Sequence, residues 1–400
     1  MDENLTWKII YIAAIFSLIV IGIVYFFISP SESPFFTEEK MEKIAEFKGT
    51  HVSGRKEGKK IWEFSAQEGW TTRDREITNL SQVVRGKIFR DGKLVVTDLF
   101  APSAKAYQHS QIVEAFNPRA YLDLGKISNP ESQDRREWTR MKADYYRYIP
   151  NEKRSEITGN VFLYKKDSTI NAQKIMINNE NKIADISDKI QLKRKDGTLR
   201  SDTLRYFSNE EKLEADGNVL INIAESGVKT RVKTSHASFF TDINKDMIIQ
   251  GSVEVLQKTK LAIAQHGIYS QNKKELLLQG AVKAVFEKAK SLLKEESAQN
   301  LRSPEAKNIL KEKTFLTADE IVLSTHSGDA RAFGSVHVYQ KGREAKSDSA
   351  IYNDKDETLA LSGNVFMKKG KEWVSAKQVV VSVKDETFTA AGSVEAEFGL

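Results

Sequence analysis

The 400-residue sequence contains no cysteine, so its fold cannot depend on disulfides, and the redox state of its surroundings cannot be inferred. Its six histidines are scattered, with no pair at metal-ligand spacing: His51, His109, His236, His266, His326 and His337. Glycine-rich phosphate loops, nucleophile elbows and the H-E-x-x-H zinc motif are also missing. Without a convergent acid, base and nucleophile, the sequence predicts no catalytic residue, no metal site and no cofactor, hence no enzyme.

The chain also lacks charge along one N-terminal run. Residues 9–28 contain no charged side chain and would span roughly 30 Å as a helix, the thickness of a bilayer core. A cleaved signal peptide would need a small-x-small site, which Phe26-Phe27-Ile28-Ser29-Pro30 does not supply. We expect a cytoplasmic tail at 1–8, a transmembrane helix at 9–29 and a linker at 30–49. This predicts a single-pass membrane protein with its N-terminus in the cytoplasm and its C-terminal body exported.

The net charge of +6 and the pI near 9.0 leave two interpretations open. The basic residues suit an anionic partner such as phosphates or a membrane surface, or they form the solvated face of exposed strands. Aromatic residues such as Phe162, Phe240 and Trp373 could stack on nucleic-acid bases. In an exported body, packing in the core and at the rim accounts for them better, so no nucleic-acid partner is predicted.

The main positive signal is a nine-residue alternation around a glycine. Apolar residues stand at −4, −2, +2 and +4 from Gly363, as Leu359, Leu361, Val365 and Met367. The same frame fits the segments around Gly217, Gly251, Gly280, Gly334 and Gly392, and Gly159 departs from it only at −4. Strict alternation is typical of a strand with one buried face.

The spacing of these glycines reveals a repeat. Gly334, Gly363 and Gly392 stand 29 residues apart, and Gly159 to Gly217 is 58, twice 29. A unit is therefore expected at 188, where Asp188 replaces the glycine. Thirteen residues after each centre comes a small residue, at Ala172, Ser201, Ala264, Ser347 and Ala376. Each unit thus holds two strands with a bend midway, which predicts an elongated all-β fold of repeated antiparallel strand pairs.

Two regions depart from the regular period. Residues 50–150 carry looser strand signals, with a hairpin turn at Asp91-Gly92, and form a juxtamembrane β domain continuous with the repeats of 151–400. Between Gly280 and Gly334 the spacing is 54, or 29 plus 25. The surplus falls at 287–311, where helical spacing predicts an inserted helical segment. It is either a partner contact or a tolerated surface decoration.

An antiparallel sheet with one continuous apolar face must close on itself or cover that face. If it curls into a V, successive rungs line an apolar trough suited to acyl chains, with basic rims suited to phosphates. A dry interior filled by side chains is the equal alternative from the pattern alone.

The recurrent motif Gly-Asn-Val at 159–161, 217–219 and 363–365 resembles the OstA/LptA/LptC family of lipopolysaccharide transport proteins. The stretch Lys60–Ala66, after a membrane helix, is similar to the opening strands of LptC. The resemblance implies an open β-jellyroll that passes lipopolysaccharide along an apolar groove. Its partners would be an inner-membrane ABC transporter and an LptA-like or outer-membrane LptD-like component. The resemblance also implies that the membrane crossed by the predicted helix is the inner membrane and that the body lies in the periplasm. The length departs from LptC, and suggests an LptC-like base with an LptA-like extension.

From the alternation and this resemblance we predict a lipid-binding groove that holds lipid A acyl chains. Its predicted residues are Leu213, Val219, Ile221, Ile249, Val253, Leu276, Leu278, Val282, Val336, Val338, Leu359, Leu361, Val365, Met367 and Phe388. The rival interpretation is a structural or adhesive β-repeat stalk with a packed, ligand-free interior. The last rung, Phe388 to Phe398, has no sequence after it to cover its edge and is expected to pair with the next bridge component. The equal alternative is that Glu395 and Glu397, on its other face, protect this edge against such pairing.

Overall fold

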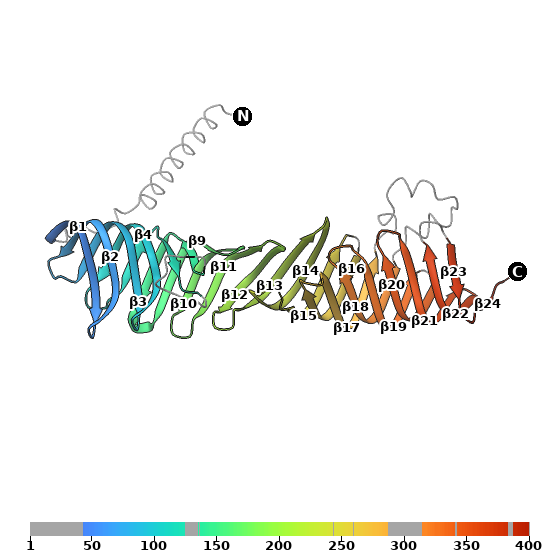
Figure 1. Cartoon of the computed structure of the whole chain (residues 1–400). Coiled ribbons are helices and arrows are strands. Elements are labelled where there is room, and N and C mark those ends of the chain that lie inside the picture. Colours follow the sequence, from blue (N-terminus) through green and yellow to red (C-terminus); the bar gives the residue numbers. More distant parts are fainter. Residues whose placement is uncertain are drawn as a thin grey trace, which may run out of the picture.

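A computed structural model of the chain contains one continuous antiparallel sheet of 24 strands (Figure 1). It describes residues 43–124, 135, 137–242, 244–258, 260–286, 314–340, 342–382 and 387–399. The strands succeed one another along a single long axis, with the blue N-terminal strands at one end and the red C-terminal strands at the other. The prediction of an elongated all-β body is confirmed.

The N-terminal strands are β1 (Lys43–Lys56), β2 (Lys59–Thr72), β3 (Ile77–Arg90), β4 (Lys93–Tyr107), β5 (Val113–Phe116), β6 (Arg119–Leu122), β7 (Thr139–Lys142) and β8 (Tyr145–Ile149), followed by the 3-10 turn η1 (Pro150–Glu152). The next are β9 (Arg154–Lys165), β10 (Ser168–Asn178), β11 (Ile183–Arg194), β12 (Gly197–Phe207), β13 (Lys212–Glu225), β14 (Val228–Phe240), β15 (Met247–Gln257), β16 (Lys260–Ser270) and β17 (Glu275–Phe286). The last are β18 (Thr314–Ser324), β19 (Ala330–Gln340), β20 (Arg343–Asn353), β21 (Thr358–Lys369), β22 (Glu372–Ser382), β23 (Thr387–Ala391) and β24 (Glu395–Glu397).

Almost every strand pairs with its neighbours in sequence. At three positions along the sheet, two short strands take the place of one long strand, which we also call a rung. There β5 and β6 both pair with β4, β7 and β8 both pair with β9, and β23 and β24 both pair with β22. The strand pairs from β9–β10 to β21–β22 each carry one register shift near the middle. A shift at the same place in every rung bends the whole sheet along one line.

The glycine centres supply these bends. Gly363 and Asn364 have φ of 77° and 45°, so two successive residues leave the extended conformation. Asp188 stands at the centre of the unit predicted at 188, where the other units have glycine. Its φ is 63°, and the register of β11 and β12 shifts between Ser187 and Ile190. The unit predicted at 188 is therefore confirmed.

A small residue faces each bend from the next strand. Ala172 pairs with Val161, and Ala376 with Val365. Ala318 pairs with Val282, as expected if the 25 surplus residues leave the register unchanged. Small side chains at this line let the sheet fold sharply without a clash between its two halves.

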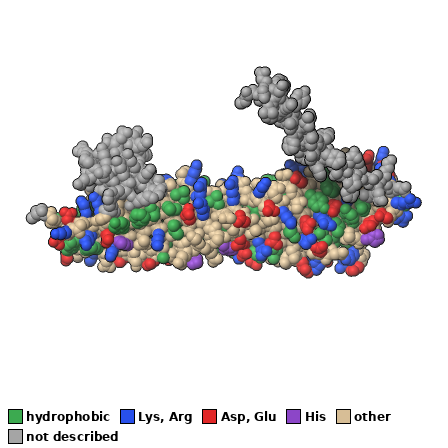
Figure 2. All heavy atoms as spheres, turned by 180° about the vertical axis from the view of Figure 1, so that it is seen from behind, with side chains coloured by type: hydrophobic (Ala, Val, Ile, Leu, Met, Phe, Trp, Pro, Cys, Tyr) green, Lys and Arg blue, Asp and Glu red, His purple; other side chains and the backbone are tan. Residues whose placement is uncertain are grey.

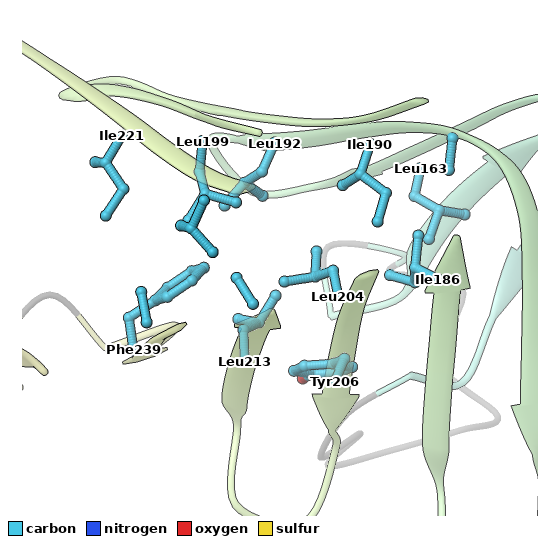
Figure 3. Packing of buried hydrophobic residues seen from close by; sticks show 14 of the residues in the cluster. Leu163, Ile186, Ile190, Leu192, Leu199, Leu204, Tyr206, Leu213, Ile221 and Phe239 are labelled. Atoms are coloured by element: carbon cyan, nitrogen blue, oxygen red, sulfur yellow. The ribbon is translucent and has the colours of Figure 1, made fainter. Parts of the chain in front are cut away.

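The bend divides the sheet into two layers whose apolar faces meet. Each glycine-bearing strand contributes the half before its bend to layer 1 and the half after its bend to layer 2. The parts of the neighbouring strands that pair with these halves belong to the same layer. Figure 3 shows Leu213 and Leu204 of layer 1 pointing toward Ile221 and Leu199 of layer 2. A single cluster of buried apolar residues extends from Ile61 to Val379.

The first strand begins at Lys43, inside the stretch 30–49 that the sequence analysis takes as a linker. The dense charges of this segment conceal its strand character because most of β1 is exposed at the edge of the sheet. The predicted tail at 1–8, membrane helix at 9–29 and helical insertion at 287–311 lie outside the described residues. Within the described ranges, no helix has the length and apolar character needed to cross a membrane.

Candidate lipid-binding groove

The space between the two layers is the candidate site, because every rung contributes apolar side chains to it. Of the predicted groove residues, eleven are buried between the layers, at 5% exposure or less: Leu213, Val219, Ile221, Ile249, Val253, Leu276, Leu278, Val282, Val336, Leu361 and Val365. Val338, Leu359 and Met367 are half-buried and pack against this cluster. Phe388 is 50% exposed.

The exposure of Phe388 follows from its position at the end of the sheet. Phe388 pairs with Val381, and Val381 with Leu359, so the three side chains share the inward face. Among the described strands, none follows β23 and β24 to cover this row. The apolar face therefore continues to the last described strands, where Phe388 is exposed.

The side chains between the layers are closely packed, and eleven of the predicted groove residues are at most 5% exposed. A cavity between the free edges of the two layers has a volume of about 40 Å³. It is lined by Leu199, Ile221 and Ile223 from layer 2 and by Phe239, Met247 and Tyr269 from layer 1. This is smaller than the roughly 150 Å³ that an engineered cavity offers to benzene. A cavity of this size does not accommodate an acyl chain.

Polar contacts join the free edges of the two layers, which we call the rims. The Arg194 guanidinium on the layer 2 rim donates hydrogen bonds to the Phe240 carbonyl oxygen at 3.2 Å and to Gln271 Oε1 at 3.1 Å. Lys182 on the layer 1 rim forms an ion pair of 2.9 Å with Asp123 on the layer 2 rim. These contacts hold the slit between the rims shut.

Further along the body the same arrangement recurs. Lys274 on the layer 1 rim pairs with Glu225 on the layer 2 rim. Ser226 Oγ lies 2.8 Å from His326 Nδ1, again across the slit. Most of these bridges use a lysine or arginine, so some of the basic residues lie along the slit. Figure 2 shows that Lys and Arg side chains are otherwise spread along the length of the body, interspersed with Asp and Glu.

The most buried bridge is formed by Lys258, Lys260 and Asp354. Lys260 Nζ lies 2.7 Å from Asp354 Oδ1, and Lys258 contacts the other oxygen, Oδ2. The Lys260 side chain is only 4% exposed. Burial lowers the pKa of Lys260. Burial would raise the pKa of Asp354, but hydrogen bonds from the two lysines outweigh this and lower it.

The sequence analysis missed these rim contacts, although one signal was present. Lys260 stands two and four residues before Ala262 and Ala264, which are both buried, so the alternation places a charged side chain on the inward face. A charge at an inward position is expected to have a partner. The partner, 94 residues away, could not be named from the sequence.

The N-terminal end of the interior is filled by larger side chains. The rings of Trp62 and Phe64 stack with centroids 5.3 Å apart, and Tyr146 and Tyr148 are also buried. Beside them, Glu63 accepts hydrogen bonds from Lys60 at 2.5 Å and pairs with Lys87 at 3.0 Å. This end differs from the Val-, Leu- and Ile-lined interior of the repeats.

Residues 231–387 match the family model described as "LptA/(LptD N-terminal domain) LPS transport protein". This stretch is similar to the LptA and LptD N-terminal family. The match covers the rungs from within β14 to the start of β23, and so includes most of the predicted groove residues. It confirms the predicted resemblance to OstA/LptA proteins and to lipopolysaccharide transport. It also confirms that the protein is not an enzyme, because the family is one of transport proteins.

A search of curated proteins finds no match. Among solved structures, the chain is similar to LptH, described as the LptA homologous periplasmic component of the conserved lipopolysaccharide transport device from Pseudomonas aeruginosa. The identity is 11%, the alignment covers 43% of this chain and 95% of that one, and the TM-score is 0.26. The described part of this chain contains no group of three or more side chains suited to a metal ion.

Proposed function

We propose that the protein is a membrane-anchored, periplasmic component of a lipopolysaccharide export machinery. It accepts lipopolysaccharide from an inner-membrane ABC transporter and passes the acyl chains along the apolar space between layers 1 and 2. The observation that carries this proposal is the continuity of the inward apolar face. Among the described residues, the buried apolar cluster extends from Ile61 to Val379 and includes most of the matched stretch.

We infer a division of labour along the body. Residues 50–150, with their aromatic-rich interior, form an LptC-like base next to the membrane, and residues 151–400 form an LptA-like extension. The LptD-like or LptA-like partner adds a strand at the C-terminal end. Support comes from β23 and β24, which pair only with β22 among the described strands. Phe388 in β23 and Phe398 just after β24 have exposed side chains.

The alternative function is a structural or adhesive β-repeat stalk. The small cavity between the rims favours it, since a packed interior needs no ligand. The two functions differ in whether lipid reaches the interior in the cell.

Site-specific photocrosslinking in living cells separates them. A photoreactive side chain is placed at Leu278 or Val365, which point inward, and at Lys283 or Phe366, which are exposed outward controls. The conduit predicts lipopolysaccharide adducts at the inward positions alone. A folded protein with adducts at neither pair would favour the packed stalk and overturn the proposal.

A further inference from the structure

The two lysines at the turn between β15 and β16 converge on a single carboxylate across the slit. Lys260 Nζ contacts Asp354 Oδ1 at 2.7 Å and Lys258 Nζ contacts Oδ2, so each oxygen has its own ammonium group. The lysines stand on the layer 2 rim, and Asp354 stands on the layer 1 rim in the turn between β20 and β21. The cluster therefore ties together parts of the chain that are distant in sequence.

Lys260 is held on the layer 1 side by two more groups. Its Nζ donates a hydrogen bond of 2.5 Å to the carbonyl oxygen of Gly328 and lies 4.6 Å from the centre of the Tyr352 ring. The backbone N–H of Asp354 donates to Asp329 Oδ1 at 2.8 Å, so a second carboxylate stands behind the first. Two turns of layer 1 are thus fastened to one turn of layer 2.

Packing alone does not require charges at this place. A buried ion pair contributes little net stability compared with apolar side chains of the same size, because both charges lose their hydration. Lys260 occupies a position at which the alternation of β16 would otherwise place an apolar residue. An ion pair does have one property that an apolar contact lacks, which is that another anion can replace its carboxylate.

The geometry suits a phosphate as that anion. A phosphate monoester presents several oxygens with more negative charge than a carboxylate, and lysine binds phosphate as a compact point charge. In the closed protein, the Asp354 carboxylate occupies the position between the ammonium groups of Lys258 and Lys260, which we call the cradle. A ligand that brings acyl chains to the slit and a phosphate to the rim would occupy both the cradle and the interior.

We propose that Lys258 and Lys260 form a phosphate-binding site for the headgroup of the transported glycolipid, and that the phosphate displaces Asp354 and so opens the slit. Asp354 is then a latch that keeps the interior closed while no ligand is bound. This inference rests on the proposed function and adds to it the residues that recognise the headgroup and control entry.

The test compares the affinity of the purified full-length protein for two forms of one lipid. The first probe is lipid A with its two phosphates, and the second is the same lipid A with the phosphates removed. Wild-type protein is expected to bind the phosphorylated form at least tenfold more tightly. The double variant Lys258→Gln, Lys260→Met is expected to bind the two forms about equally.

Asp354→Asn is expected to bind both forms more tightly than wild type, because no carboxylate competes for the cradle and the rims separate more easily. The single variant Lys258→Gln changes a half-exposed side chain and replaces the double variant if that one fails to fold. It is expected to lower the ratio of the affinities for the two lipid forms at least threefold. Glu275→Gln is the matched control. Glu275 pairs with Arg331 at 2.7 Å within layer 1 and does not bridge the slit.

Inorganic phosphate distinguishes the sources of the ligand. If it abolishes the preference at about 10 mM, the cradle accepts any phosphate; if it does not, the cradle requires the phosphate on the lipid. Both results support the site. Equal binding of the two lipid forms by wild type overturns the phosphate site but leaves the conduit standing. Failure to bind either form overturns both.

Discussion

The Nδ2 atom of Asn364 donates a hydrogen bond of 2.9 Å to Asp348 Oδ2 on the preceding strand. The same bond joins Asn218 to Asp202 at 2.7 Å and Asn160 to Asp144 at 2.8 Å. In each case the glycine before the asparagine faces that aspartate. The Gly-Asn-Val motif is therefore one half of a bend whose other half is an aspartate fifteen residues before the glycine.

Gly363→Ala is expected to destabilise the protein by about 2 kcal/mol, because φ is 77° and a new Cβ would clash with Asp348. Gly370→Ala is the matched control. Its φ is 61°, but a Cβ there meets nothing within 4 Å, so only the backbone strain remains. Thermal unfolding followed by circular dichroism measures both. Equal losses of stability would show that the clash with Asp348 has no cost.

The hydrogen bond itself can be measured with a double-mutant cycle. Asn364→Ala and Asp348→Ala are each expected to cost about 1 kcal/mol, with a coupling energy of similar size because the two side chains contact each other. Additive effects would contradict the assignment. At the Gly334 bend, serine stands where asparagine is found elsewhere, and Asp319 faces the glycine. Ser335→Asn should therefore stabilise the protein by about 0.5 kcal/mol.

Glu63→Gln is expected to destabilise the N-terminal end in a pH-dependent way. Burial acts to raise the pKa of Glu63, but hydrogen bonds and ion pairs with Lys60 and Lys87 lower it below the ordinary 4.5. The ionised form thus stabilises the fold above pH 4.5, and this contribution is lost as the pH falls through the lowered pKa. The variant should be about 2 kcal/mol less stable at pH 7.

The difference between Glu63→Gln and wild type should shrink as the pH is lowered below 4.5. Chemical denaturation at a series of pH values measures it. Glu180→Gln is the control, since Glu180 pairs with Lys153 at an exposed site where solvent screens the charges. A constant difference at all pH values would mean that the charge of Glu63 does not contribute.

Joining the rims should prevent lipid from entering. The chain has no cysteine, so Ser226→Cys and His326→Cys, whose side chains lie in contact across the slit, can be linked by a short cleavable thiol reagent. Linked protein is expected to lose lipid adducts at Leu278 and to recover them after cleavage. Each single-cysteine variant, treated in the same way, is the control. Undiminished adducts would mean that lipid enters through the ends of the body.

Deleting residues 387–400 should leave the body folded and abolish capture of the next bridge component. The deletion removes β23 and β24 and leaves β22 as the last strand, with a different set of side chains at the edge. Circular dichroism checks the fold, and co-purification with the LptA-like or LptD-like partner checks the capture. If folding and capture are both unchanged, end-to-end pairing through this edge is wrong.

Much of the fold is local and was therefore open to prediction. The alternation around each glycine sets which residues face inward, and the 29-residue spacing sets the order of the strands. Both depend only on residues within one rung and its neighbour. Leu278 and Val365 are inward for this reason, and Asp188 could be recognised as a bend without glycine because its four apolar slots are filled.

The closure of the slit could not be predicted in the same way. The rim partners of Lys260 lie in turns three strands (Gly328) and five strands (Asp354) further along the sequence, and this offset depends on how far the strands tilt. The tilt angle of the strands cannot be read from the 29-residue period or from the alternation of apolar residues. The start of β1 at Lys43 was missed for a different reason, since an exposed edge strand shows no apolar alternation.

Because each strand pairs almost only with the strands beside it, the length of the body is proportional to the number of its strands. Neighbouring strands lie about 4.8 Å apart, so one 29-residue unit adds two strands, or roughly 10 Å, without altering the cross-section. The distance that such a protein bridges is then set by the number of its units. For the proposed conduit, duplication or deletion of one unit would change this distance by the same step, with no change to the chemistry of the interior.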